Sequence, residues 1–190
     1  MSLKIAGVDE AGRGALAGPV VSAAVVFFGE IDPSIFKDSK TLSKEKRQEL
    51  YEILMKGSAY VGLGIVGETV IDQVNILQAS LLSMQKAVTA LGIRPDEVLI
   101  DGDRAPDLPD YKIRTIIRGD QSIPEISAAS IIAKQTRDKI MRDYHVKYPQ
   151  YNFISNSGYG TAEHYQSIFQ YGASDIHRKS FNLTQQQRLF

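Results

Sequence analysis

The feature that most restricts the fold is the apolar run Val20–Phe28, in which Ser22 is the only polar residue. A run of this length that is rich in β-branched and aromatic residues predicts a buried strand. It is far shorter than the roughly 20 apolar residues that a membrane-spanning helix needs. A second apolar run, Ile5–Val8, predicts another strand just before it. Both strands need further elements to cover them, which the rest of the chain must supply.

The remaining patterns alternate between those of strands and those of helices. Apolar runs and period-two alternation predict strands at Val61–Ile65, Val98–Ile100 and Ile113–Ile117. Caps, terminators and helical spacing predict helices at Ser43 to about Lys56, Asn75–Leu91, about Pro124–His145, and Thr161 to about Gly172. This order predicts an α/β fold in which helices flank a mixed central sheet, followed by a mostly helical C-terminal part.

The composition excludes several classes of protein. With 190 residues, 43% hydrophobic and 23% charged, the chain suits a single domain over residues 1–190, with about 182–190 as a flexible tail. The absence of cysteine excludes disulfides and thiolate metal sites. We expect a cytoplasmic monomer that does not enter a membrane, because the N-terminal residues lack a signal-peptide pattern and no apolar run is long enough to cross a bilayer.

The charges balance, with 22 basic and 22 acidic residues, so a globally basic nucleic-acid binder is not indicated. Basic residues nevertheless cluster at 37–47, 134–147 and 177–179. Most such clusters are solvated faces, and these become relevant to binding only if the fold brings them to one side.

Asp9 and Glu10 are adjacent carboxylates at the edge of the predicted core, and the turn Gly12–Gly14 follows them. Two like charges there are costly to desolvate unless a cation lies beside them. Neighbouring side chains of a strand point to opposite faces, so both reach one site only if the strand bends. Otherwise the pair simply lies on the surface at a strand end.

Asp101 is a further candidate, because it ends the run Val98–Ile100 at the edge where α/β folds gather ligands. Its other interpretation is an ordinary Asp-Gly turn. Asp103 and Asp120 are rivals for the same role.

Asp138 falls on a polar stripe of a helix whose first turns are otherwise small and apolar, together with Ser127, Ser130 and Lys134. Lys134 and Asp138 can form an ordinary i,i+4 ion pair. A polar stripe on a buried helix, however, favours a wet, charged cleft.

The candidate site therefore consists of four carboxylates: Asp9, Glu10, Asp101 and Asp138. Oxygen ligands of this kind suit Mg²⁺ or Mn²⁺. The three histidines do not have the spacing of a zinc site. A pair of divalent ions about 4 Å apart can activate a water and stabilise the leaving oxygen in phosphodiester hydrolysis.

Gly62–Gly67 is a literal G-x-G-x-x-G sequence that a helix follows. A dinucleotide site also needs an acidic residue about 20 positions on, and none lies there. The alternation with Val61, Leu63 and Ile65 instead favours a strand whose glycine face lets a helix approach closely.

Six motifs occur in order along the chain. They are GVDEAGRG at Gly7–Gly14, DSK at Asp38–Lys40, IDGD at Ile100–Asp103, GDQSIPEISAASIIAKQTRD at Gly119–Asp138, GYGT at Gly158–Thr161 and HRKSF at His177–Phe181. Together they resemble bacterial ribonuclease HII. The resemblance implies a ribonuclease H-like fold and a metal-dependent endoribonuclease. Such an enzyme hydrolyses the RNA strand of RNA–DNA hybrids and incises duplex DNA 5′ of single embedded ribonucleotides, leaving 3′-OH and 5′-phosphate ends.

The resemblance also assigns residues to roles. It implies that Asp9, Glu10, Asp101 and Asp138 are the catalytic metal ligands, with two Mn²⁺ or Mg²⁺ ions. It implies a substrate-binding set of Gly12, Arg13, Gly14, Ser39, Lys40 and Tyr159. The backbone of the glycine turn would contact the ribose 2′-OH, Tyr159 would stack on the sugar beside the ribonucleotide, and Ser39 and Lys40 would hold DNA phosphates. Positioning roles fall to Lys134, Thr161, His164 and Arg178.

The C-terminal sequence Gln186–Phe190 resembles the short Gln-x-x-Leu-Phe peptides that dock on the bacterial sliding clamp. The alternative is that Leu189 and Phe190 fold back and cover apolar surface of the same chain.

Two other functions compete with the nuclease. A nucleic-acid-binding module could use the basic clusters without chemistry, but the complete set of four carboxylates argues against it. A phosphatase for small molecules could use the same metals, but Tyr159 and the basic clusters favour a polymer.

Overall fold

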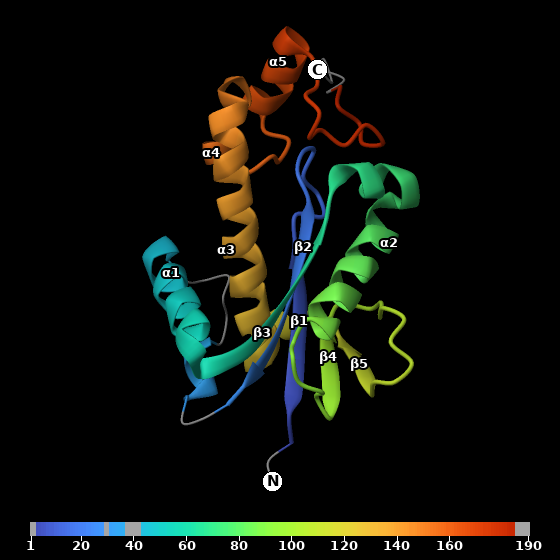
Figure 1. Ribbon diagram of the computed structural model, residues 1–190. Helices are drawn as coiled ribbons and strands as arrows, with labels where there is room; N and C mark the ends of the chain where they lie inside the picture. Colours follow the sequence, from blue (N-terminus) through green and yellow to red (C-terminus); the bar gives the residue numbers. More distant parts are fainter. Residues whose placement is uncertain (1–2, 29–30, 37–42, 185–190) are drawn as a thin grey trace.

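The computed structural model describes residues 3–28, 31–36 and 43–184. A five-stranded sheet with the strand order β3-β2-β1-β4-β5 lies at the centre (Figure 1). Its strands are β1 (Ile5–Ala11), β2 (Val20–Phe27), β3 (Ala59–Val66), β4 (Glu97–Asp101) and β5 (Ile113–Ile116). Neighbours among β1, β2 and β3 are antiparallel, whereas β4 runs parallel to both β1 and β5. The predicted mixed sheet is confirmed.

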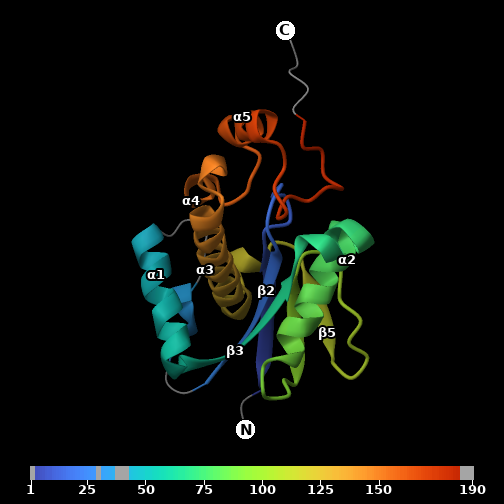
Figure 2. The same ribbon diagram turned by 45° about the horizontal axis from the view of Figure 1, so that its top comes forward.

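Helices cover both faces of this sheet (Figures 1 and 2). Helix α2 (Glu68–Thr89) lies on one face, and α3 (Pro124–Lys147) lies with α1 (Lys44–Ile53) on the other. Strand β2 shows why, since Ala24 and Val26 pack into the α2 cluster while Ala23 and Val25 pack into the α1 and α3 cluster. A strand that is apolar on both faces needs a helical layer on each.

The glycines of β3 allow α2 to pack directly on the strand. A Cβ atom at Gly62 would meet the backbone of Ala87, and one at Gly64 would meet the backbone of Ser83. Beside them, the hydroxyls of Ser22 and Ser83 are 2.5 Å apart and satisfy each other inside the core. The prediction that the G-x-G-x-x-G sequence is a strand with a glycine face is confirmed.

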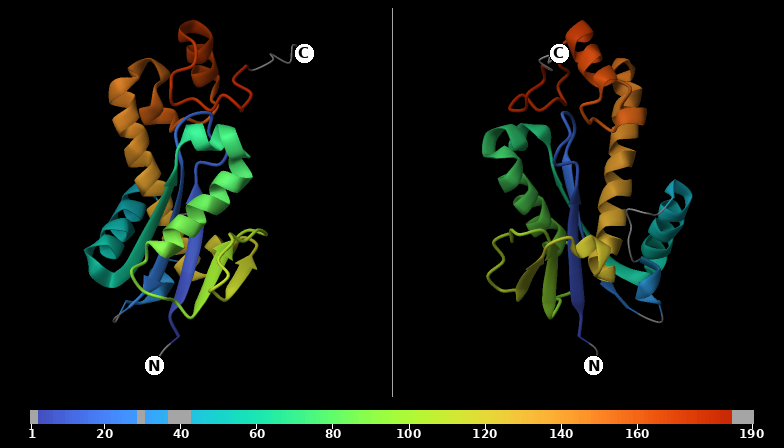
Figure 3. Two further views of the ribbon diagram at one scale, coloured as in Figure 1. Left: turned by 45° about the vertical axis from the view of Figure 1, so that its right-hand side comes forward. Right: turned by 180° about the vertical axis from the view of Figure 1, so that it is seen from behind.

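The C-terminal part packs against one end of the sheet, beside the loop between β1 and β2 (Figure 3). It contains α4 (Phe153–Asn156), α5 (Ala162–Tyr171) and the 3-10 helix η4 (Pro149–Tyr151). Isolated bridges join Ala15 to Tyr159 and Ala17 to His177. The remaining short elements are the 3-10 helices η1 (Pro33–Phe36) and η3 (Gly119–Gln121) and the π-helical turn η2 (Leu54–Ser58).

Most predicted helix ends agree with the structure. Ser43 and Thr161 cap α1 and α5 through their hydroxyls, as expected. The predicted helix start at Asn75 is confirmed, although the structure adds a helical stretch at 68–74 before it, so that α2 as a whole begins at Glu68. Asn75 has φ 70° and its side chain accepts a hydrogen bond from the Gln78 N–H, so it acts as a cap inside a longer, interrupted helix. None of the helices in the described residues is long and apolar enough to cross a membrane.

Candidate active site

Asp9 on β1 and Asp101 at the end of β4 lie next to each other, just past the last paired residues of these two parallel strands. The register of β1 and β4 pairs Val8 with Ile100, so the next residue on each strand is an aspartate. Asp9 is only 6% exposed and accepts a hydrogen bond from the Glu10 N–H at 2.7 Å. Asp101 accepts one from the Gly119 N–H at 2.7 Å. The pairing of parallel strands therefore brings together carboxylates that lie far apart in sequence.

Burial and neighbouring charge raise the pKa of two of the carboxylates at this edge, Asp9 and Glu10. Burial raises the pKa of Asp9 well above 3.8, and the charges of Glu10 and Asp101 add to the increase, although a hydrogen bond from Ser130 on α3 opposes it. Burial also raises the pKa of Glu10, partly offset by Arg13, whose Nη1 lies 3.1 Å from Glu10 Oε1. The charge of Asp101 thus acts on both Asp9 and Glu10, so acidic side chains gather at this edge.

Asp138 lies further along α3 and has its own partners. Lys134 Nζ is 2.8 Å from one carboxylate oxygen, and the Ser157 hydroxyl is 3.2 Å from the other. The i,i+4 ion pair that the sequence offered as an alternative is therefore formed. Across the described residues, no group of three or more His, Cys, Asp or Glu side chains is arranged to hold a metal ion.

The rival aspartates lie in different surroundings. The Asp103 side chain is 75% exposed and has Arg104 3.9 Å away. Asp120 is 1% exposed and belongs to η3, next to the glycine whose N–H binds Asp101. Only Asp101 ends β4 beside Asp9.

The residue types at this edge fit a hard divalent cation. Asp9, Glu10 and Asp101 offer only oxygen atoms, which Mg²⁺ and Mn²⁺ prefer. A nearby dication would also favour the charged forms that burial disfavours at Asp9 and Glu10.

Two buried arginines hold the loop between β1 and β2. Arg178 is 0% exposed and donates to the carbonyls of Gly18, Arg13 and Gly12 at 3.0, 2.9 and 2.7 Å. Burial and the neighbouring charge of Arg137 lower the pKa of Arg178 to about 10. The guanidinium therefore stays charged at neutral pH, and its three bonds fix the course of the loop.

Arg137, which the sequence interpretation missed, is the second of these arginines. It is 1% exposed and donates to the carbonyls of Pro19, Ser157 and Ala17 at 2.9, 2.8 and 3.0 Å. Its guanidinium also lies 5.3 Å from the centre of the Tyr159 ring. The available signal was a basic residue beside Asp138 on a helix whose first turns are small and apolar.

Arg178 determines which way the turn Gly12–Gly14 presents its peptide groups. Every peptide bond in the described residues is trans, so each N–H points away from the carbonyl of the same peptide group. The carbonyls of Gly12 and Arg13 point to Arg178, and the N–H groups of Arg13 and Gly14 therefore point away from it. Gly12 has φ 95°, and a Cβ there would meet the Arg137 side chain, so the turn requires glycine at this position.

Tyr159 lies beside this turn. Its backbone bridges to Ala15, its N–H donates to the Asn156 carbonyl at 2.9 Å, and its side chain remains 39% exposed. Arg137 supports the ring from one side, and the exposure of Tyr159 leaves the ring accessible to a ligand.

The other predicted positioning residues lie next to Tyr159. The Thr161 hydroxyl accepts a hydrogen bond from the His164 N–H at 3.2 Å and so caps α5. His164 is buried, and its Nδ1 is 2.9 Å from the Tyr159 carbonyl. Ser39, Lys40 and the segment Gln186–Phe190 lie outside the described residues.

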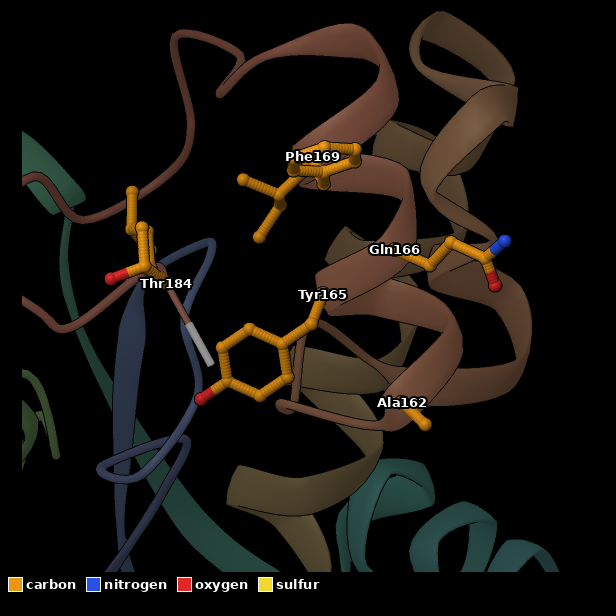
Figure 4. A pocket seen from close by; sticks show the side chains of 7 residues that line it. Ala162, Tyr165, Gln166, Phe169 and Thr184 are labelled. Atoms are coloured by element: carbon orange, nitrogen blue, oxygen red, sulfur yellow. The ribbon is translucent and has the colours of Figure 1, made fainter. Parts of the chain in front are cut away.

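A separate groove of about 810 Å³ lies along α5 (Figure 4). Tyr165, Phe169 and Thr184 are among its lining residues, and it includes none of the four carboxylates. The groove is therefore distinct from the carboxylate edge.

The chain matches known proteins over nearly its whole length. The model of the family described as Ribonuclease HII covers residues 6–184. The Ribonuclease HII of Coxiella burnetii (strain Dugway 5J108-111) is 49% identical over 189 residues, which are 100% of this chain and 93% of that protein.

Solved structures show the same fold. The ribonuclease H2 from Pyrococcus horikoshii OT3 has a TM-score of 0.78 and 28% identity, with 95% of each chain covered. The structure of the PCNA:RNase HII complex from Archaeoglobus fulgidus has a TM-score of 0.79 and 23% identity, with 98% of each chain covered. With six motifs in order, a ribonuclease H-like sheet and a full-length family match, the chain belongs to the ribonuclease HII family, whose members are nucleases that hydrolyse phosphodiester bonds.

Proposed function

We propose that the chain cuts the RNA strand of RNA–DNA hybrids and incises duplex DNA on the 5′ side of single embedded ribonucleotides, leaving 3′-OH and 5′-phosphate ends. The observation that carries this proposal is the turn Gly12–Gly14, whose carbonyls are bound from behind by Arg178. The outward N–H groups of Arg13 and Gly14 lie in the same loop that begins beside the carboxylates of β1.

Outward N–H groups suit recognition of a ribose. The 2′-OH is the group that distinguishes RNA from DNA at a single nucleotide, and its oxygen accepts hydrogen bonds. Donors on the backbone do not depend on a side-chain rotamer, and here two buried arginines hold the loop that carries them. Tyr159, exposed beside the turn, is available to stack on the neighbouring sugar.

Asp9, Glu10, Asp101 and Asp138 would hold two divalent ions, Mn²⁺ or Mg²⁺, in the active complex. Dependence on divalent metals is a property of the ribonuclease H family and agrees with this oxygen-only set. When bound, the ions supply the activation of a water and the stabilisation of the leaving oxygen. In the metal-free protein, Lys134 compensates the charge of Asp138, and Arg13 compensates part of that of Glu10.

The remaining residues of the predicted site contact the backbone of the nucleic acid or position those that do. Ser39 and Lys40 are proposed to hold DNA phosphates, with lysine acting as a point charge. Arg178 positions the turn, and Thr161 and His164 position Tyr159 through α5.

Cleavage of a DNA duplex that contains one ribonucleotide tests the proposal. With Mg²⁺ or Mn²⁺, we expect a single cut on the 5′ side of the ribonucleotide and none in an all-DNA duplex of the same sequence. Gly14→Ala supplies a matched test of the turn, because its added Cβ meets no atom within 4 Å. It should therefore fold normally but cleave the ribonucleotide poorly. Equal cleavage of both duplexes, or full activity of Gly14→Ala, would contradict the proposed recognition.

We also propose that Gln186–Phe190 docks on the sliding clamp. The Archaeoglobus fulgidus relative was solved as a PCNA:RNase HII complex, which supports a clamp partner for this chain. Leu189 and Phe190 would fill an apolar pocket with about micromolar affinity, roughly −8 kcal/mol.

The competing possibility is that these two side chains occupy the groove along α5. Thr184, the last residue that the structure describes, is one of the residues that line this groove. Clamp binding by the intact protein and by a chain truncated after Gln185 separates the two. Loss of binding on truncation supports the tether, whereas loss of thermal stability without any clamp binding supports the groove.

A further inference from the structure

Two buried histidines face each other behind Tyr159. His164 Nε2 and His177 Nε2 are 3.0 Å apart, and the two side chains are 0% and 1% exposed. The rings of Tyr151 and Phe153 surround them at centroid distances of 4.8 to 6.2 Å. A close contact of two ring nitrogens requires that one carries a proton and the other does not.

Ser174 decides which nitrogen carries it. The Ser174 backbone N–H donates to His177 Nδ1 at 2.9 Å, so that nitrogen has no proton. A neutral His177 then carries its proton on Nε2 and donates it to His164 Nε2. His164 must carry its own proton on Nδ1, which donates to the Tyr159 carbonyl at 2.9 Å. One backbone donor thus fixes the tautomers of both rings.

The chain of hydrogen bonds requires both rings to be neutral, because a second proton on either would set two N–H groups against each other. Burial lowers the pKa of both histidines, and that of His177 reaches about 4 with a further contribution from His164. The other ionisable groups around them are the Tyr151 phenol, which donates to the Gly172 carbonyl, and Glu163, which acts on His164.

We propose that His177 is a positioning residue for Tyr159. By donating to His164, it forces His164 to present Nδ1–H to the Tyr159 carbonyl. The Tyr159 N–H is held at the same time by Asn156, so the peptide groups on both sides of the tyrosine are fixed. The inference rests on the proposed contact of Tyr159 with the ribonucleotide.

The alternative is that the two histidines only fill the core. If His177 positions Tyr159, activity should depend on whether the side chain at residue 177 donates a hydrogen bond to His164. If it only fills the core, activity should depend on the shape of that side chain. His177→Gln can place an amide N–H near the position of Nε2, while the shorter His177→Asn cannot reach it. The two variants therefore separate donation from polarity.

Tautomers give a test that needs no substrate. In the intact protein, nitrogen and carbon chemical shifts of the imidazoles should identify His177 as the Nε2–H form and His164 as the Nδ1–H form at neutral pH. His164 found as the Nε2–H form, or either ring found charged, would overturn the proposal.

Kinetics test the consequence for Tyr159. His177→Asn should raise KM for a duplex with one ribonucleotide by about tenfold with a smaller effect on kcat, and His177→Gln should recover most of that loss. In a Tyr159→Ala background, His177→Asn should cost little more, since both changes disturb one contact. The same loss in both backgrounds would show that His177 acts on the fold and would overturn the proposal. If Tyr159→Ala itself cleaves normally, the proposed role of Tyr159 fails, while the tautomers still decide the hydrogen-bond chain.

Discussion

The carboxylate edge and the loop between β1 and β2 differ in how their charged side chains are compensated. At the edge, Asp9 is buried and Glu10 is partly buried, like charges lie near them, and their pKa values are raised. In the loop, Arg137 and Arg178 are also buried, but each guanidinium donates three hydrogen bonds to backbone carbonyls.

The difference matches the ligand proposed for each region. A cation stabilises a site that is unfavourable without it, because burial and neighbouring carboxylates disfavour the charged forms of Asp9 and Glu10. Recognition of a hydroxyl group instead needs donors that do not move, and the two arginines hold in place the loop that carries the N–H groups of Arg13 and Gly14. Substitutions in the two regions should therefore have opposite effects on stability.

The largest expected effect is on catalysis at the edge. Asp101→Asn should lower the cleavage rate by roughly a thousandfold or more, about 4 kcal/mol, because metal charge stabilisation depends on the carboxylate. Single-turnover cleavage of a duplex with one ribonucleotide measures it. Asp103→Asn is the matched control, since that side chain is exposed, and should be nearly as active as the wild type. If the control lost activity instead, the assignment at the end of β4 would be wrong.

Arg178→Lys should cost stability, because an ammonium cannot reproduce a fork that binds three carbonyls. We expect a loss of about 3 kcal/mol, or roughly 6–12 °C in melting temperature for a chain of this size. Thermal unfolding measures it, with the exposed Arg142→Lys as control. An unchanged melting temperature would remove the contrast between the two regions.

Tyr159 lies beside the loop, where its ring is next to the Arg137 guanidinium. If stacking dominates, Tyr159→Ala should reduce the stabilisation of the bound substrate by about 1–3 kcal/mol and slow cleavage at a single ribonucleotide accordingly. Tyr159→Phe should keep most of the wild-type cleavage rate. Rates on the ribonucleotide-containing duplex give the comparison. A phenylalanine variant as poor as alanine would assign the effect to the hydroxyl.

The smallest effect concerns the stability of the metal-free protein. The pKa of Asp9 is raised on folding, so above its ordinary value of 3.8 the folded state holds a proton that the unfolded chain has lost. Stability therefore falls as the pH rises through this window, and Asp9→Asn should remove that loss. We expect its melting temperature at pH 7 to rise by roughly 2–4 °C, about 1 kcal/mol.

Added Mg²⁺ supplies the control for this last prediction. It should stabilise the wild type and have less effect on Asp9→Asn, because the ligand is gone. If the metal-free Asp9→Asn protein were less stable than the wild type, the carboxylate would stabilise the fold itself, and its proposed role in binding a cation would lose this support.

The elements of the fold could be predicted from sequence, because their signals are local. The apolar run Val20–Phe28, the hydroxyl caps at Ser43 and Thr161, and the glycines of β3 each reflect a requirement of neighbouring residues. The same holds for Asn75, whose local cap signal marks the break in α2, whereas the helical stretch at 68–74 before it was not predicted.

The sequence by itself also supplied Asp9, Glu10 and Asp101 as candidates, because carboxylates at the ends of apolar runs are visible without a structure. It could not supply Arg137, which contacts carbonyls more than 100 positions away, or the pairing of His164 with His177. Whether Asp138 faces a cleft or pairs with Lys134 was also open until α3 was placed. Residue types and periodicity are properties of short stretches, whereas the partners of a buried polar group depend on which distant backbone carbonyls the finished fold leaves beside it.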